Sequence, residues 1–185
     1  DGICRLLQLR RVAFVASEKP EMSVSAKTNQ VEADMIAAMV ERIFRQADRF
    51  DYSATVGVIV PYRNQIATVR NAIDRYGIPA LHSITIDTVE RFQGSQRDYI
   101  IYGLTVQQRY QLNFLTDNVF EEDGTLIDRK LNVAMTRARK HLTIVGNPDI
   151  LAGSAVYRRL MDFMKSRGCY FNVACEKFCA GDFSV

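Results

Sequence analysis

The sequence has no apolar run long enough to cross a bilayer. Its longest apolar stretches have the length of β-strands, far short of the ~20 residues that a membrane-spanning helix needs. The chain opens at Asp1 without Met, and nothing near this end has the layout of a signal peptide. We therefore expect a soluble, cytoplasmic protein with no membrane partner, cut from a longer chain.

Several catalytic signatures are missing as well. The sequence contains no G-x-x-x-x-G-K-[ST] phosphate loop and no Asp-Glu pair after a strand that would hold magnesium, which excludes a self-sufficient NTPase. It has only two histidines, His82 and His141, and no G-x-S-x-G segment, which disfavours other hydrolases. No G-x-G-x-x-G follows a strand, which argues against a stand-alone Rossmann-like enzyme.

The four cysteines match neither a disulfide framework nor the paired C-x2-C spacing of zinc sites. We expect reduced thiols and no metal site, although Cys175 and Cys179 would share one face of a helix. The net charge is +3, with 18 Arg against 6 Lys. Guanidinium groups suit phosphate oxygens and carboxylates, but this mild basic excess alone does not identify a nucleic-acid-binding protein.

Strand-like and helical segments alternate along the chain, and its 185 residues fit one domain, 1–185. Buried strands that alternate with helices predict an α/β fold with a mostly parallel sheet, whose ligands lie at the carboxyl ends of the strands. The predicted strands are 10–17, 55–60, 83–89, 98–106 and 141–147. Residues 107–128 form a long polar segment, and 153–185 follow no clear pattern.

Three helices are predicted between these strands. The first is capped by Asn29 or Thr28, with Glu32 placed as in a capping box. The second begins after Pro61 and ends at Gly77. The third contains "LNVAMTRARK", 131–140.

Three segments combine strand ends with polar side chains. In "VGVIVPYRNQ" (56–65), Tyr62, Arg63 and Gln65 offer a ring, a guanidinium and an amide just beyond a strand; these side chains are equally compatible with a solvated helix start. In "TVERFQGSQRD" (88–98), Gly94 permits a close backbone approach and Thr88 a phosphate contact, but a simple turn would also use the glycine.

The third segment is "DRKLNVAMTRARKHLTIVGN", 128–147. Leu131, Ala134 and Met135 form an apolar stripe that Ala138 continues, so a helix leaves its two central arginines off the stripe, about 200° apart. Five basic residues and no acid lie between positions 129 and 140. Either an external anion or solvent is their partner.

These segments resemble, in order, motifs IV, V and VI of the second RecA-like domain of superfamily 1 helicases, in the branch of the nonsense-mediated-decay RNA helicase and its bacterial relatives. "TVERFQG" resembles the motif V core and "LNVAMTRAR" the motif VI signature; "KTNQVEADMI" resembles the helix that precedes motif IV. The resemblance spans about 10–152 and implies a P-loop NTPase fold, a RecA-like three-layer sandwich.

The resemblance also implies roles for particular residues. Arg137 matches the arginine finger, the catalytic residue that reaches the γ-phosphate from the second domain. Gly94 and Gln93 match nucleotide contacts, with Tyr62 and Arg63 as further candidates. Gln96 stands where many relatives carry a ribose-binding Glu, which weakens that contact.

For nucleic acid, Thr88 matches a backbone-phosphate contact. Arg139 is a structural residue or a nucleic-acid contact, Gln65 is a further candidate, and Tyr110 and Phe114 either stack on bases or pack internally. The implied protein hydrolyses ATP with Mg²⁺ held by the missing upstream RecA-like domain, and moves on single-stranded nucleic acid, with DNA favoured. The isolated piece is expected to be inactive. The alternative is a degenerate helicase-like module that binds nucleic acid or a partner without ATP turnover.

Overall fold

The computed structural model describes residues 1–23, 25–92 and 95–185. Its central feature is a six-stranded parallel sheet in the order β3-β2-β4-β7-β1-β8, all within these described ranges. The strands are β1 (Val12–Ala16), β2 (Val56–Ile59), β3 (Thr85–Asp87), β4 (Arg97–Gly103), β7 (Ala138–Gly146) and β8 (Tyr170–Asn172). The predicted α/β class is confirmed.

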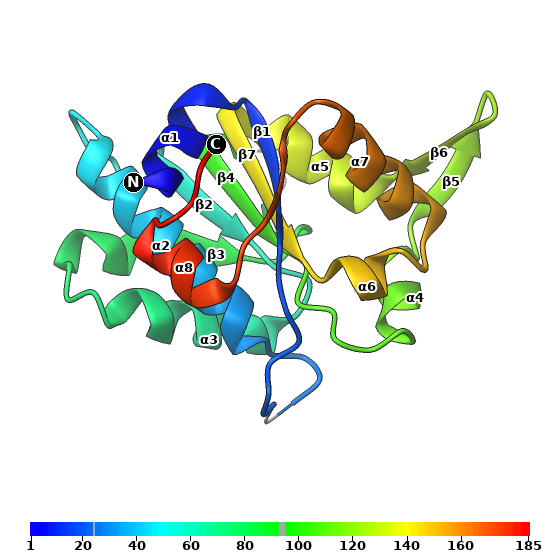
Figure 1. Cartoon of the computed structure of the whole chain (residues 1–185), viewed down its shortest axis with the longest axis horizontal. Helices are drawn as coiled ribbons and strands as arrows, with labels where there is room; N and C mark the ends of the chain where they lie inside the picture. The colour runs from blue at the N-terminus through cyan, green and yellow to red at the C-terminus, as the bar shows by residue number, and fades with distance from the viewer. Residues whose placement is uncertain (24, 93–94) are drawn as a thin grey trace.

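Helices cover both faces of this sheet, which makes a three-layer sandwich of the RecA-like kind (Figure 1). One layer contains α1 (Gly2–Leu9), α2 (Gln30–Gln46), α3 (Arg63–Asp74) and α8 (Cys175–Ala180). The other contains α5 (Arg129–Arg137), α6 (Pro148–Leu151) and α7 (Ala155–Ser166), with α4 (Gln111–Leu115) at its margin. A 3₁₀ turn, η1 (Pro79–Ser83), precedes β3.

The strands lose their polar alternation because both faces of the sheet are buried. In β2, Val58 packs into the core under α2 and α3, whereas Ile59 packs into the core on the other side. In β4, Ile101 and Ile100 divide in the same way. Strands β1, β2, β4 and β7 therefore each contribute apolar side chains to two separate cores.

The predicted starts of the first two helices are confirmed in part. Asn29 caps α2 by accepting a hydrogen bond from Glu32 N at 3.1 Å. The reciprocal half of the capping box is not formed, because Asn29 N donates to Gln65 Oε1 instead. Helix α3 begins at Arg63 and ends at Asp74, and Gly77 follows with φ +65°, a conformation that favours glycine.

The basic helix is shorter than predicted. It ends at Arg137, and β7 begins at Ala138, so Arg139 lies on a strand and the expected helical separation of the two arginines does not apply. Ala138 does not continue the helical stripe, and Met135 is 49% exposed. The β-branched run Thr143–Val145 lies fully buried in β7, and the strand extends back from it to Ala138 beside β4.

Residues 107–128 are more ordered than their polarity suggested. They contain α4 and an antiparallel hairpin of β5 (Val119–Glu122) and β6 (Thr125–Asp128), which extends from the sandwich in Figure 1. The tail 153–185 supplies α7, β8 and α8. Within the described residues, no helix combines the length and apolarity needed to span a membrane.

Candidate functional site

The segment 88–96 connects two opposite edges of the sheet. Asp87, the last residue of β3, pairs with Ile59, the last residue of β2, so both lie at the carboxyl ends of the parallel strands. Arg97 is the first residue of β4 and lies at the opposite, amino ends of the strands. The chain therefore passes from the carboxyl edge of the strands to their amino edge. Phe92 is fully buried on this path and lies against Gly57, where an added Cβ would come within 2.5 Å of its ring.

Consequently, the sequence-predicted residues do not gather at one edge. Thr88 and Tyr62 lie at the carboxyl edge, as expected. Gln96 and Arg137 lie at the amino edge, because Arg97 pairs with Ala138 in the parallel register of β4 and β7. Segment 88–98 follows β3 and leads into β4, and segment 128–147 leads into β7, so Gln96 and Arg137 lie away from the carboxyl ends of the strands, where ligands of such sheets are expected.

At the amino edge, Gln96 is exposed and its Nε2 donates to the carbonyl of Thr136 at 3.4 Å. This contact places Gln96 beside the last turn of α5, next to Arg137. Gln93 and Gly94, the other predicted nucleotide contacts, lie outside the described residues. The amide of Gln96 offers an acceptor but no charge.

Helix α5 presents Arg137 at its C-terminal end. Asp128 caps the helix by accepting from Lys130 N at 2.8 Å and Leu131 N at 3.1 Å, while buried Leu131 and Ala134 hold it against the sheet. Arg137 is half-buried. Its Nε is buried without a hydrogen-bond partner, and among the described residues it forms no ion pair.

Arg139 has a different environment. Its Nε is 2.8 Å from Asp98 Oδ1, and its Nη2 donates to the Ala54 carbonyl at 3.0 Å. Lys140 Nζ lies 2.7 Å from the other oxygen of Asp98. Partial burial opposes ionisation of Asp98, but the hydrogen bonds and charges of Lys140 and Arg139 outweigh it and lower the pKa of the carboxyl. Arg139 is thus held within the protein, in line with a structural role.

At the carboxyl edge, Thr88 follows β3, and Val60 N donates to the Asp87 carbonyl at 3.0 Å. This bond places Thr88 beside Pro61. The Thr88 N–H donates to the Asp87 carboxylate at 2.8 Å, and its carbonyl accepts from Arg91 N at 3.1 Å. Thr88 is half-buried, and its hydroxyl has no hydrogen-bond partner among the described residues.

Tyr62 belongs to an aromatic cluster at the same edge. Its ring stacks on Phe114 with centroids 5.1 Å apart and an interplanar angle of 17°, and its hydroxyl accepts from Gln111 Nε2 at 3.3 Å. Burial raises the pKa of the Tyr62 hydroxyl. Lys130 Nζ lies 4.2 Å from the centre of the Phe114 ring. Phe114 thus packs internally on one face while remaining 45% exposed.

A pocket of about 610 Å³ opens beside this cluster, and its volume is in the range of small-molecule sites. It is lined by Tyr62, Phe114, Tyr110 and Gln111 together with the loop 25–27. Tyr110 is 67% exposed, and Arg63 is exposed at the first turn of α3. Sequence reasoning named the aromatic residues but missed the role of Gln111, whose Nε2 holds the Ala26 carbonyl at 2.7 Å.

Gln65 is not available to a ligand. Its side chain is fully buried and clamps the start of α2, because Gln65 Oε1 accepts from Asn29 N and its Nε2 donates to Asn29 O, both at 2.8 Å. The predicted contact between Gln65 and nucleic acid is therefore withdrawn. The amide instead satisfies the backbone of a helix end that is itself buried.

Sequence reasoning also missed Glu32, which it treated as part of a cap. The side chain is fully buried; its Oε2 accepts from Thr105 N at 2.7 Å and its Oε1 from Ser17 Oγ at 3.1 Å. Burial raises the pKa of Glu32 to about 8, although the hydrogen bonds oppose this. No group of three or more potential metal-ligating His, Cys, Asp or Glu side chains occurs in the described part of the chain.

Comparison with known proteins places the chain in a family. Residues 6–149 match a family model described as "AAA domain". The chain is 32% identical over 159 residues to "Helicase sen1" of Schizosaccharomyces pombe, with 85% of this chain and 9% of that protein covered. It is 32% identical over 167 residues to "Regulator of nonsense transcripts 1 homolog" of Drosophila melanogaster, with 85% and 13% covered.

A third relative is "ATP-dependent helicase NAM7" of Saccharomyces cerevisiae, 28% identical over 145 residues, with 76% of this chain and 14% of that protein covered. The chain thus spans less than a sixth of the length of these three relatives. Together with the parallel sandwich, these matches show that the chain belongs to the AAA-domain family and is a helicase-like domain of the superfamily 1 kind.

Proposed function

We propose that this chain is the second RecA-like half of an ATP-dependent helicase or translocase, and that Arg137 is its arginine finger. The observation that carries the proposal is the contrast between the arginines of one segment. Arg139 is paired with Asp98, which it shares with Lys140, whereas the half-buried Arg137 forms no ion pair among the described residues. A guanidinium held in this way has its charge available for an anion from outside.

The position of Arg137 supports this role. It is the last residue of α5, and Gln96 reaches the carbonyl of its neighbour Thr136, so a phosphate-binding guanidinium and a ribose-binding amide are adjacent on the amino edge. In this proposal the upstream domain supplies the phosphate loop and the Mg²⁺ ligands, and ATP binds between the two domains. Gln93, Gly94 and Gln96 then contact the nucleotide from this side.

The carboxyl edge of the sheet supplies the binding surface, or track, for single-stranded nucleic acid. The Thr88 hydroxyl and the exposed guanidinium of Arg63 suit backbone phosphates, and the pocket beside Tyr110 and Phe114 suits a stacked base. Tyr62 is assigned to this edge rather than to the nucleotide, because its ring is stacked on Phe114. Segment 88–96 joins the two edges of the sheet. In this proposal it couples the state of the bound nucleotide to the affinity for single-stranded nucleic acid.

No feature of the described residues favours DNA over RNA. The name of one relative, "Regulator of nonsense transcripts 1 homolog", refers to transcripts, so RNA is included as a substrate wherever DNA is tested. The competing function is a helicase-like module that binds without ATP turnover. Gln96 favours it, because the charge that would bind the ribose more strongly is missing.

The test is ATP hydrolysis by the full-length protein with Arg137→Ala, measured with and without single-stranded RNA and DNA. Fingers in phosphoryl-transfer enzymes contribute ~10³–10⁵ in rate, so stimulated hydrolysis should be lost while nucleotide affinity stays within a few fold. Arg139→Ala is the matched control and should retain most activity. Hydrolysis by the Arg137 variant near the parental rate refutes the finger, and a parent without hydrolysis favours the binding module.

A further inference from the structure

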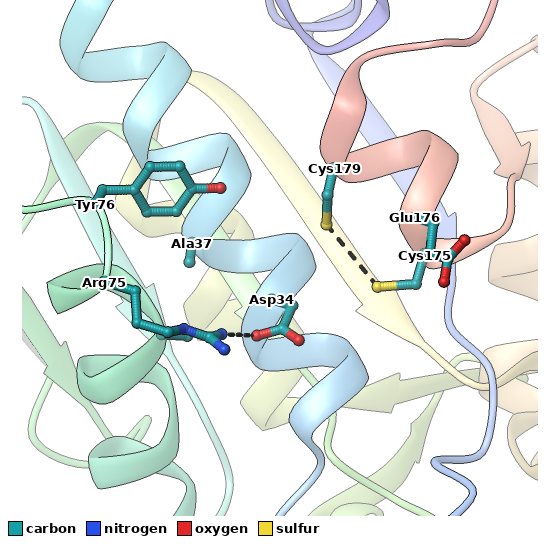
Figure 2. Close-up of a pocket in the computed structure, with 8 residues that line it drawn as sticks. Asp34, Ala37, Arg75, Tyr76, Cys175, Glu176 and Cys179 are labelled. Atoms are coloured by element: carbon teal, nitrogen blue, oxygen red, sulfur yellow. Dashed lines mark hydrogen bonds and ion pairs between the residues drawn. The ribbon is translucent and has the colours of Figure 1, made fainter.

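A second pocket lies away from both candidate edges. It is open to solvent, has a volume of about 430 Å³ and is lined by residues of α2, of α8, and of α3 with the turn that follows it. Figure 2 shows the two sulfurs of Cys175 and Cys179 on α8, with the ion pair of Arg75 and Asp34 and the Tyr76 ring on the α2–α3 side. None of the residues assigned to the nucleotide or the strand lines this pocket.

The two thiols lie on one face of α8, one turn apart. Their Sγ atoms are 3.9 Å apart, and either can donate to the other. Both side chains are half-buried and line the pocket, so a small molecule that enters it meets both sulfurs. The other two cysteines are placed differently, since Cys169 is 9% exposed with its Sγ on the Arg167 carbonyl, and Cys4 lies on α1.

The surroundings distinguish the two sulfurs. The hydrogen bond with Cys175 lowers the pKa of Cys179, whereas burial and the charge of Asp34 raise it. The charges of Arg42 and Arg75 lower it further, although Arg42 is also paired with Asp1 and Glu41, and Arg75 with Asp34. The same hydrogen bond, together with burial, raises the pKa of Cys175. Arg42 Nη2 donates to the Cys179 carbonyl at 3.0 Å, which fixes its charge near this residue. The contact of Arg42 with the Cys179 backbone therefore favours Cys179 as the attacking thiolate, with Cys175 as its hydrogen-bond donor.

We propose that Cys179 and Cys175 form a peroxide-oxidisable dithiol, in which a hydroperoxide oxidises Cys179 and Cys175 then closes a disulfide. In the first step the Cys179 thiolate attacks one oxygen of the hydroperoxide. The S–O bond forms, the O–O bond breaks, and the departing oxygen takes a proton to leave as water or an alcohol. Sulfur loses two electrons and the peroxide gains them, which leaves a sulfenic acid.

In the second step Cys175 loses its proton and its sulfur attacks the Cys179 sulfur. The S–S bond forms as the S–O bond breaks, and the hydroxide combines with the proton of Cys175 to leave as water. A thiolate next to a resolving cysteine is the usual arrangement of an oxidation-sensitive pair. The 3.9 Å contact between the sulfurs means that Cys175 is in place before the first step.

Closing the disulfide requires α8 to loosen. Residues four apart on a helix have Cβ atoms about 5–6 Å apart, whereas a disulfide needs about 3.5–4.5 Å. Helix α8 has only six residues, ends at Ala180 and is followed by Gly181 with φ +74°. The bond between Arg42 and the Cys179 carbonyl, and that between Gly2 N and the Gly181 carbonyl at 2.7 Å, should weaken on oxidation. The disulfide would thus release the end of the chain from α1 and α2.

The experiment treats the 185-residue chain with hydrogen peroxide and counts thiols. The parent has four, and the count should fall to two with the loss of two hydrogen atoms in mass, a 175–179 crosslink in the peptide map, and reversal by dithiothreitol. Hydrogen exchange at 175–182 should increase in the oxidised protein. A Cys169→Ser control should form the same crosslink.

Two variants separate the steps. Cys175→Ser should stop at the sulfenic acid, which dimedone labels on Cys179, and Cys179→Ser should slow the first oxidation roughly tenfold. Thermal unfolding of each reduced variant establishes that it is folded, and Cys179→Ala provides a second form if serine is not tolerated. First labelling of Cys4 or Cys169, or thiol loss in the parent without a 175–179 crosslink, would overturn the proposal.

Discussion

The carboxylate of Glu32 accepts a hydrogen bond from the backbone N–H of Thr105 at 2.7 Å, where α2 meets the end of β4. Thr105 has a φ of +64°, a conformation that a β-branched residue rarely adopts, so this bond holds the chain in an unfavourable turn. The same carboxylate accepts from Ser17 after β1. Glu32 therefore ties together the loops that follow two strands beneath the carboxyl edge.

This arrangement makes stability depend on pH. Burial raises the pKa of Glu32 to about 8 from 4.5, so the folded state holds a proton that the unfolded state releases. Its contribution to stability is full below about pH 4.5 and is lost as pH rises toward about 8, with a slope of at most about 1.4 kcal/mol for each pH step of one. Urea unfolding at several pH values should show this decline.

Glu32→Gln tests the assignment, because the amide keeps the shape and can accept from Thr105 N and donate to Ser17 Oγ. The variant should lose the decline between pH 4.5 and 8 and be at least as stable as the parent near the upper end of that range. Glu176→Gln, at an exposed position, is the matched control and should keep the parental profile. Parallel profiles for Glu32→Gln and the parent would contradict the assignment.

The two arginines of the motif VI segment should differ in stability as well as in activity. Arg139→Ala removes the bonds to Asp98 and to the Ala54 carbonyl, and should lower the free energy of unfolding by about 0.5–1 kcal/mol, the range of partly exposed pairs. Arg137→Ala removes no ion pair among the described residues and should stay within about 0.5 kcal/mol of the parent. Urea denaturation of the isolated chain measures both.

The reverse order would identify Arg137 as a structural residue. High salt supplies an additional check, because it screens exposed charge pairs and should reduce the difference between Arg139→Ala and the parent. The Arg137 variant should respond to salt as the parent does.

The sequence predicted most of what depends on local periodicity. The buried run 55–60 and the apolar spacing of 35–43 were sufficient for β2 and α2, because strand and helix place side chains at fixed intervals. The end of the basic helix was not predictable in this way, since Ala138 and Arg139 suit either state and pairing with β4 decides between them. The hairpin 119–128 was missed because its strands are largely exposed and carry little apolar pattern.

The candidate site was likewise predicted only in part from the sequence. The resemblance to helicase motifs gave Arg137, Gln96 and Thr88 as candidates. Their division between the two edges of the sheet follows from the register of β2, β3, β4 and β7, which no local pattern contains. Gln65 and Glu32 were misjudged for a related reason. A polar side chain on a helix is usually exposed, unless a buried backbone group elsewhere in the chain requires it as a hydrogen-bond partner. Here Gln65 bonds the backbone of Asn29, and Glu32 bonds the backbone of Thr105.

The aromatic pocket at the carboxyl edge gives the last prediction. Tyr110 is exposed and lines the pocket, so Tyr110→Ala should weaken binding of a labelled single-stranded nucleic acid to the full-length protein about 5- to 150-fold, as loss of one stacked base does. Fluorescence anisotropy with RNA and DNA of one sequence measures it and compares the two strands. Tyr52→Ala, exposed in the 51–54 turn that precedes β2 at the amino edge, should leave affinity unchanged. Equal losses from both variants would mean that exposed aromatic residues bind the strand without a defined site, and the carboxyl edge would no longer be the track.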